Sequence, residues 1–210
     1  TGVMVAVVPF DWQAHDTYFV VAHLHYVLVG GFIFPVLAAI YYWLPHVSGR
    51  KHLEGLGRTA FGLIFLGFNA AFLPMHLTGL LGMPRRVYTY GGDLGWNLLN
   101  LVSSISSFVL AIGFALVLVD VIQVARFGRR TRRNPWNAGT LEWAMPTPPP
   151  AYNIGSQPEV GDRDPLHEDR DLPAAMARGE GYLGEPRNGW RETLGVNMLT
   201  GKPEQVVLLP

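Results

Sequence analysis

The sequence contains no cysteine, which excludes disulfides, thiolate metal sites and a cysteine nucleophile. Charge is also scarce over residues 1–125, which carry five acidic and five basic side chains, whereas residues 126–210 carry eleven of each sign. Eleven of the sixteen prolines lie in that second part. The net charge of zero therefore hides a membrane-like part and a polar part, and neither is basic enough to indicate nucleic-acid binding.

Three long runs contain no Asp, Glu, Lys or Arg, namely residues 17–44, 59–84 and 94–119. About 20 apolar residues suffice to cross the hydrocarbon core of a bilayer, so each run predicts a transmembrane helix. We expect an all-α fold, part of an integral membrane helical bundle, with helices over about 17–44, 57–84 and 94–125. The alternative is the buried helical core of a soluble protein, in which runs of this length are rare.

The composition divides the chain into a transmembrane part, residues 1–125, and a polar, proline-rich tail, residues 126–210. Thr147–Ala151 (TPPPA) favours polyproline II. Gly155–Glu192 is polar and poor in aliphatic side chains. We therefore expect a mostly irregular tail, largely extended or disordered. Because the chain begins at Thr1 without a signal-peptide pattern, we expect it to be processed or a piece of something longer.

The basic residues predict the orientation in the membrane. Ser48–Arg58 and Arg126–Arg133 hold most of the lysine and arginine near the spans, and in a three-span chain they lie on the same side. Positive loops stay inside. The N-terminus should therefore lie outside and the tail should be cytoplasmic.

Two histidines, His23 and His25, stand two residues apart inside the first apolar run. A helix turns about 100° per residue, so their side chains point about 200° apart and cannot easily bind one metal ion. They can each hold a separate metal at a similar depth. Neutral imidazole is a good ligand for haem iron, so this geometry suits two haems flanking one helix. The alternative for an intramembrane histidine is a hydrogen-bonded packing residue.

Charged side chains gather at the predicted outer end. His15 and Asp16 suit a hard divalent cation such as Mg²⁺ or Mn²⁺, or are simply polar surface. Asp11, four residues earlier, could join them or share a proton with a haem propionate. Arg85 and Arg86 depart from the charge rule, and either snorkel at the interface or pair with buried anions such as propionates.

Asn69 and His76 lie seven residues apart, on one face of the second span. For them we favour interhelical hydrogen bonding over a chemical role. The chain shows no nucleophile elbow, phosphate-binding loop or thiolate cluster.

Two segments carry a resemblance to a known family. His15–Val27 (HDTYFVVAHLHYV) and Pro74–Arg86 (PMHLTGLLGMPRR) resemble subunit I of cytochrome c oxidase, the haem–copper terminal oxidase. The resemblance runs from about residue 1 to 145 and includes Asn134–Trp143 (NPWNAGTLEW). It implies the C-terminal part of subunit I, covering its last three transmembrane helices, in the inner (plasma) membrane of a bacterium.

The resemblance also implies roles for individual residues. His23 would be the proximal ligand of the high-spin haem (haem a3), and His25 one of two axial ligands of the low-spin haem (haem a). His15 and Asp16 would bind Mg²⁺ or Mn²⁺ at the interface with subunit II. The residues implied in the haem propionate region are Arg85, Arg86, Asp11, His15 and Tyr18.

One position departs from the family pattern, and a larger part of the pattern is absent. Leu24 stands where many members have phenylalanine, so an aromatic bridge between the two ligands would not be required for electron transfer. Copper is implied for the parent protein, but its ligands, the second low-spin haem ligand and the histidine–tyrosine crosslink belong to earlier helices. No complete catalytic site is therefore expected in this chain.

The implied partners are the rest of subunit I, a copper-bearing subunit II, subunit III, cytochrome c and the lipid membrane. The end of the tail, Arg191–Pro210, is similar to linkers in bacterial chains that fuse subunits I and III. The implied activity of the parent is reduction of O2 to water with electrons from cytochrome c, coupled to proton pumping, and the fragment alone would be inactive.

Two alternatives stay open. A quinol oxidase of the same superfamily would share every residue named so far. A haem-free membrane transporter or passive anchor would explain the three spans but not the arginine pair or the two-sided histidines. For the fragment we expect three helices without a self-contained core, with His23 and His25 on open faces.

Overall fold

The computed structural model describes residues 1–145, 147–149, 161–168, 170, 172–173, 191–196 and 203–208. The chain forms two compact units, one made of Thr1–Tyr41 and His52–Phe127 and the other of Tyr42–Lys51 and Gly128–Pro210. Residues 150–151 of the predicted polyproline segment and most of Gly155–Glu192 lie outside the described residues. The division at residue 125 stays a prediction.

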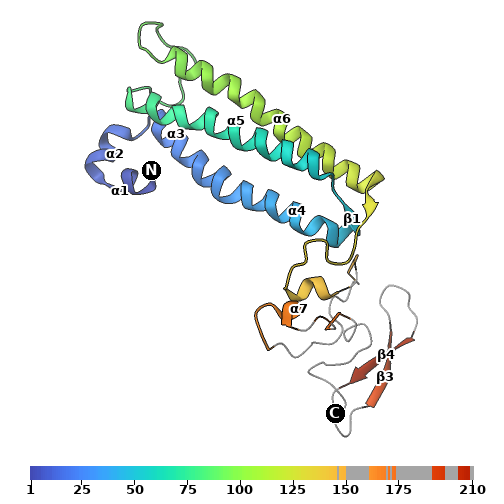
Figure 1. Cartoon of the computed structure of the whole chain (residues 1–210). Coiled ribbons are helices and arrows are strands. Elements are labelled where there is room, and N and C mark those ends of the chain that lie inside the picture. The colour runs from blue at the N-terminus through green and yellow to red at the C-terminus, as the bar shows by residue number, and fades with distance from the viewer. Residues whose placement is uncertain are drawn as a thin grey trace. The chain divides into compact units, whose positions relative to one another are not determined.

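Three long helical spans dominate the first unit (Figure 1). Each is long and apolar enough to cross a membrane, which confirms the prediction of an all-α membrane protein with three transmembrane helices. The first span consists of three consecutive helices, α3 (Tyr18–His25), η1 (Tyr26–Ile33) and α4 (Phe34–Ser48). The second span is α5 (Glu54–Leu80), and the third is α6 (Asn97–Phe127). Two short helices precede them, α1 (Gly2–Ala6) and α2 (Val8–Ala14).

The ends of the spans differ by a few residues from the predicted ones. α5 begins at Glu54 rather than 57, because Glu54 lies in the positive first turn and reaches Arg58 at 3.6 Å. It ends at Leu80 rather than 84, since Gly82 has a φ of +84° and Pro84 cannot continue a helix. The first span continues past Pro45 to Ser48.

The middle of the first span is a π-helix, η1, which begins directly after His25. At its end the Phe34 N–H donates to the carbonyl of Val29, five residues earlier. Pro35 follows, and it has no N–H to continue an α-helical ladder. π-Helical turns are rare and frequently occur at functional sites. Here the π-helix follows directly after the candidate ligands His23 and His25.

α5 and α6 lie side by side because small residues remove side chains from their contact (Figure 1). A Cβ built on Gly67 would lie 2.6 Å from the Leu110 backbone nitrogen. One built on Gly113 would lie 2.9 Å from the backbone nitrogen of Ile64. Ala60, Ile64 and Val117 form a buried apolar cluster there. The expectation of no self-contained core is therefore wrong for α5 and α6, since glycine allows their backbones to meet without other helices.

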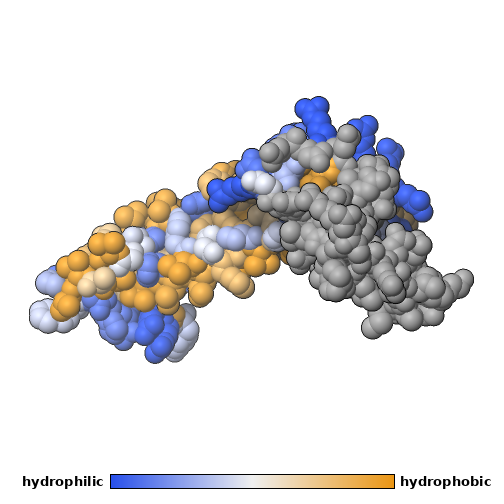
Figure 2. Space-filling model, turned by 90° about the horizontal axis from the view of Figure 1, so that it is seen from below, coloured by the Kyte–Doolittle hydropathy of each residue, from blue (hydrophilic) through white to orange (hydrophobic). Residues whose placement is uncertain are grey.

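Much of the apolar surface of the first span is exposed, although Phe19 and Ala22 are buried. Its most apolar 18-residue window contains no buried residue. Hydrophobic side chains dominate the visible surface of the helical unit in Figure 2. The exposed large apolar residues of this span include Leu24, Val27, Leu28, Phe32, Val36 and Ile40.

The second unit contains short elements and a buried apolar cluster that includes Trp143, Ala144, Leu166 and Leu172. Trp143 is fully buried, and its indole N–H donates to the Tyr42 hydroxyl at 2.8 Å. The Trp136 indole N–H donates to the Tyr42 carbonyl at 2.9 Å. These bonds tie the loop after the third span to the end of α4. The described elements are β1 (Arg50–Lys51), β2 (Arg129–Arg130), η2 (Leu141–Ala144), α7 (Pro165–Glu168), and the antiparallel pair β3 (Arg191–Val196) and β4 (Pro203–Leu208).

Candidate functional site

The two candidate ligands lie on α3 and face different neighbours. The His25 ring stacks on Phe72 of α5, with ring centroids 4.1 Å apart and an interplanar angle of 15°. The His23 ring contacts the N-terminal segment instead, through Thr1 and Gly2. Both histidines are half-buried. The expected open faces are thus partly covered, from opposite sides of one helix.

A local hydrogen bond orients the His25 ring. Its Nδ1 lies 2.7 Å from the carbonyl oxygen of Val21, one turn earlier. A carbonyl can only accept, so Nδ1 carries a proton, and in the neutral ring Nε2 then presents a lone pair. No hydrogen bond to Nε2 occurs in the described part of the chain. This arrangement, with one ring nitrogen held by the backbone and the other left for a metal, is the one that metal-ligating histidines use.

His23 uses its ring nitrogen Nδ1 in a hydrogen bond, while no hydrogen bond to Nε2 occurs within the described residues. Its Nδ1 lies 2.8 Å from the Thr1 hydroxyl, which can donate or accept. A Cβ built on Gly2 would lie 3.4 Å from Cε1 and 4.0 Å from Nε2 of the ring. The chemistry of His23 therefore fits haem iron, and a haem on this side requires Thr1 and Gly2 to move away from the ring.

The predicted charged residues gather at the N-terminal end of the first span. The Asp16 carboxylate pairs with the guanidinium of Arg85. His15 lies between two carboxylates, with Nδ1 at 3.6 Å from Asp11 and Nε2 at 3.9 Å from Asp16. Asp11, His15, Asp16 and Arg85 thus form one cluster, although Arg85 is far away in the sequence.

Backbone hydrogen bonds hold this cluster together. The Tyr18 N–H donates to the Met83 carbonyl at 3.0 Å, and the Arg85 N–H donates to the Asp16 carbonyl at 2.8 Å. Thr17 and Pro84 form an isolated antiparallel bridge between these bonds. The loop after α5 is therefore attached to the start of α3, and this fixes Arg85 beside Asp16.

Two residues of the cluster adopt a backbone conformation that side chains disfavour. Asp16 has a φ of +59° and Arg86 a φ of +67°. Such left-handed residues persist only where surrounding contacts enforce them, and they concentrate at functional sites. The Arg86 side chain is exposed, and the buried Nε of Arg85 has no hydrogen-bond partner among the described residues. Both guanidinium groups thus keep donors for an anion. Tyr18 is half-buried at the same place.

The cluster offers an incomplete set of ligands for a divalent cation. The described residues contain no group of three or more histidine, aspartate or glutamate side chains positioned to hold a metal. His15 and one oxygen of Asp16 remain as two ligands, while Arg85 takes the other Asp16 oxygen. Mg²⁺ is bound by one or two carboxylates and keeps several waters, so the pair fits Mg²⁺ or Mn²⁺ with further ligands from water or a partner.

Asn69 confirms the predicted interhelical hydrogen bond. It accepts from the Tyr26 hydroxyl at 2.9 Å and donates to the Phe65 carbonyl at 2.8 Å. His76 lies instead between the rings of Phe19 and Tyr26, at 5.0 and 5.4 Å. Its buried Nε2 has no hydrogen-bond partner among the described residues, so the hydrogen-bond prediction is not met at this atom.

Sequence reasoning did not find Phe72 and Val21, which position His25. Val21 has a recognisable signal, since a carbonyl four residues before a helical histidine lies within its reach. Phe72 has none, because its contact depends on how α5 packs against α3.

Comparisons with known proteins identify the family of this chain. The family described as Cytochrome C and Quinol oxidase polypeptide I matches residues 1–109. The chain belongs to this family. Cytochrome c oxidase subunit 1 of Alkalihalophilus pseudofirmus is 48% identical over 167 residues, which cover 79% of this chain and 27% of that protein. The corresponding subunit of Bacillus subtilis is 46% identical over 167 residues, which again cover 79% of this chain and 27% of that protein.

Quinol oxidases match this oxidase-family chain as well. Quinol oxidase subunit 1 of Bacillus subtilis is 40% identical over 167 residues, or 78% of this chain and 26% of that protein. The chain spans about a quarter of the length of the relatives that it matches. Family membership therefore covers only part of the complete subunit.

The cluster of Asp11, His15, Asp16 and Arg85 leads to a prediction for metal binding. In the assembled oxidase prepared from Mn²⁺-grown cells, Asp16→Ala should reduce bound Mn²⁺ by about 10–100-fold if Asp16 is the carboxylate ligand that we predict. Electron paramagnetic resonance of Mn²⁺, quantified against haem content, measures this. Asp93→Asn neutralises another exposed aspartate in the loop before α6 and should retain the signal. Full Mn²⁺ occupancy in the Asp16 variant would contradict a metal role.

Proposed function

We propose that this chain is the C-terminal part of subunit I of a bacterial respiratory oxidase that reduces O2 to water with electrons from cytochrome c, coupled to proton pumping. The observation that carries the proposal is the pair of histidines on opposite sides of one span. His25 has its Nδ1 held by the backbone, and neither histidine has a hydrogen bond to Nε2 within the described residues. The rest of subunit I, a copper-bearing subunit II and subunit III would complete the enzyme.

His25 would serve as one axial ligand of the low-spin haem and His23 as the proximal ligand of the high-spin haem. When bound, the haems supply one-electron transfer and oxygen binding. The protein's part is to orient the ligands. The bond from His25 Nδ1 to Val21 fixes the tautomer, and the Phe72 ring fixes the plane of the imidazole.

The cluster of Asp11, His15, Asp16 and Arg85, together with Arg86, would hold the propionate groups of the haems. Arg85 and Arg86 would donate charge-assisted hydrogen bonds to propionates, in the region of Asp11 and Tyr18. Because Asp16 pairs with Arg85, it limits how that guanidinium can turn. His15 and Asp16 would at the same time bind Mg²⁺ or Mn²⁺ facing subunit II. The site would thus link the haem edges to the partner subunit.

The proposed orientation places the N-terminus and this cluster on the outer side of the inner membrane and residues 126–210 in the cytoplasm. The basic residues after the first and third spans support this orientation. An outer position suits a cluster that would meet the subunit receiving electrons from cytochrome c.

Quinol is the second candidate electron donor. The quinol oxidase relative matches nearly the same share of the chain as the cytochrome c oxidases, at 40% rather than 48% identity. We favour cytochrome c because the higher identities belong to cytochrome c oxidases. Every residue proposed above is equally consistent with quinol oxidation.

The test uses the purified parent complex. We expect haem bands in its reduced-minus-oxidised visible spectrum, oxygen consumption with reduced cytochrome c, and no measurable oxidation of a soluble quinol. Oxygen consumption with quinol but not with cytochrome c would show that quinol is the electron donor. The proposed haem sites would be unaffected by this result. A spectrum without haem bands would instead favour a haem-free transporter or anchor.

A further inference from the structure

The segment that carries Arg85 and Arg86 is attached to α6 by the side chain of Asn100. The Asn100 amide nitrogen Nδ2 donates to the Met83 sulfur at 3.3 Å and to the Tyr90 hydroxyl oxygen at 3.0 Å. Met83 lies two residues before Arg85, and Tyr90 lies four residues after Arg86. One amide group in the first turn of α6 therefore joins the two ends of the segment that contains the arginine pair.

Both hydrogen bonds of Asn100 can form at the same time, because an amide NH2 group carries two hydrogens. Met83 is buried, and Asn100 is half-buried. The Met83 carbonyl also accepts from the Tyr18 N–H at 3.0 Å, which fixes this residue to the start of α3. The bond from Asn100 to the Tyr90 hydroxyl then fixes the other end of the segment relative to Met83.

Tyr90 is held by its ring as well as by its hydroxyl. The ring packs edge-on against Trp96, with ring centroids 5.6 Å apart and an interplanar angle of 64°. Trp96 is buried, and its indole N–H donates to the Leu81 carbonyl at 3.2 Å. The residues at the beginning of α6 therefore hold the loop after α5 through side chains.

This attachment matters more for Arg86 than for Arg85. Arg85 is fixed by its N–H bond to the Asp16 carbonyl and by its ion pair with the Asp16 carboxylate. Arg86 is exposed and forms no ion pair within the described residues. Its φ of +67° is a conformation that persists only where surrounding contacts enforce it. The bonds at Met83 and Tyr90 supply such contacts on both sides of Arg86.

We propose that Asn100 is a positioning residue for Arg86. By joining Met83 and Tyr90, it keeps the segment in the conformation in which the Arg86 guanidinium meets a haem propionate. The inference rests on the proposed function, which places the haems beside this segment. A positive charge near a haem favours the reduced form, because reduction adds an electron to the iron. Loss of Asn100 should therefore lower a haem midpoint potential without removing a haem.

The test measures the midpoint potential of the low-spin haem in the assembled oxidase by spectroelectrochemical titration. At the wild-type midpoint, Asn100→Ala should lower the ratio of reduced to oxidised haem about tenfold, a shift of about 59 mV. This is close to the lower end of what one hydrogen bond to a charged group contributes. Tyr90→Phe removes one acceptor, keeps the ring against Trp96, and should give a smaller shift in the same direction. Both haem bands should remain in the spectra of these variants.

A double-mutant cycle shows whether Asn100 acts through Arg86. Arg86→Gln should lower the potential by itself, and Asn100→Ala should cause little further change in that background. Full additivity of the two shifts would overturn the proposal, as would an unchanged potential in Asn100→Ala, and both results would leave the proposed haem ligands intact. A wild-type complex without haem bands would instead contradict the proposed function itself.

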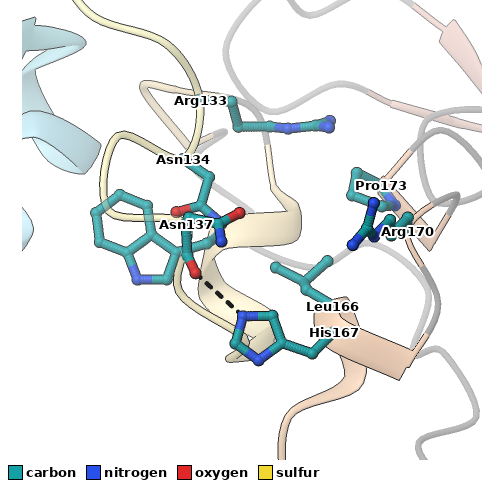
Figure 3. Close-up of a pocket in the computed structure, with 8 residues that line it drawn as sticks. Arg133, Asn134, Asn137, Leu166, His167, Arg170 and Pro173 are labelled. Atoms are coloured by element: carbon teal, nitrogen blue, oxygen red, sulfur yellow. Dashed lines mark hydrogen bonds between the residues drawn. The ribbon is translucent and has the colours of Figure 1, made fainter.

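Two variants serve as matched controls. Asn97→Ala removes another amide from the first turn of α6, whose Nδ2 donates to the Gly92 carbonyl at 2.9 Å, beyond the segment from Met83 to Tyr90. Arg133→Gln removes an exposed guanidinium that lines a cavity of about 600 Å³ in the second unit, on the proposed cytoplasmic side (Figure 3). Both controls should keep the wild-type potential. A shift in Asn97→Ala as large as that in Asn100→Ala would overturn the specific role of Asn100.

Discussion

Replacing His23 with alanine in the assembled oxidase should abolish oxygen reduction and remove the high-spin haem from the optical spectrum. The imidazole is the proposed proximal ligand, and an alanine methyl group has no lone pair with which to replace it. We expect a rate loss of at least about 1,000-fold, equivalent to about 4 kcal/mol. Oxygen consumption and carbon monoxide difference spectra, which report on the high-spin haem, measure the two effects.

The low-spin haem should survive that change, because its proposed ligand His25 points to the other side of the helix. His25→Ala should give the converse result, with the low-spin band lost. The informative result is that each variant loses one haem band and keeps the other, since general misfolding would remove both bands together.

His46→Gln is the control for this pair. It removes a histidine near the other end of the same span, where His46 packs against Trp143. Both haem bands should remain. A His23 variant with a normal high-spin haem and normal oxygen reduction would falsify the assignment.

Gly79→Ala should prevent stable packing of the first span against α5. A Cβ at Gly79 would lie 2.0 Å from the Phe19 backbone nitrogen and 2.7 Å from the Phe19 Cα. The clash is with backbone, so a change of rotamer cannot relieve it. Phe19 is itself buried between Phe10 and His76. We expect a cost at or above the upper end of overpacking, about 3 kcal/mol.

The measurements for Gly79→Ala are the yield of assembled, haem-containing oxidase and its thermal midpoint, and both should fall. Gly62→Ala is the matched control on the same helix, because no atom lies within 4 Å of its added Cβ. It should be neutral or stabilising by about 0.5–1 kcal/mol, since alanine favours a helix over glycine. Equal behaviour of the two variants would contradict the close α3–α5 contact.

The three spans could be predicted from the sequence because the absence of charge over about 20 residues is a direct requirement of the bilayer core. Their ends were less predictable. Hydropathy does not register that Glu54 can begin α5 through its partner Arg58, or that Gly82 ends it before the apolar run stops. The π-helix after His25 was also unforeseen, since its hydrogen bonds shift by one residue without a change in composition.

The sequence by itself determined that His23 and His25 point to opposite sides of one helix, since that angle follows from the helical repeat alone. It also determined the number of spans. Only the tertiary structure decided that Arg85 meets Asp16, that Phe72 supports His25, and that Arg129 and Arg130 pair with Lys51 and Arg50. These contacts join segments far apart in the chain. Their geometry depends on how closely helix backbones approach, and glycines such as Gly79 set that distance.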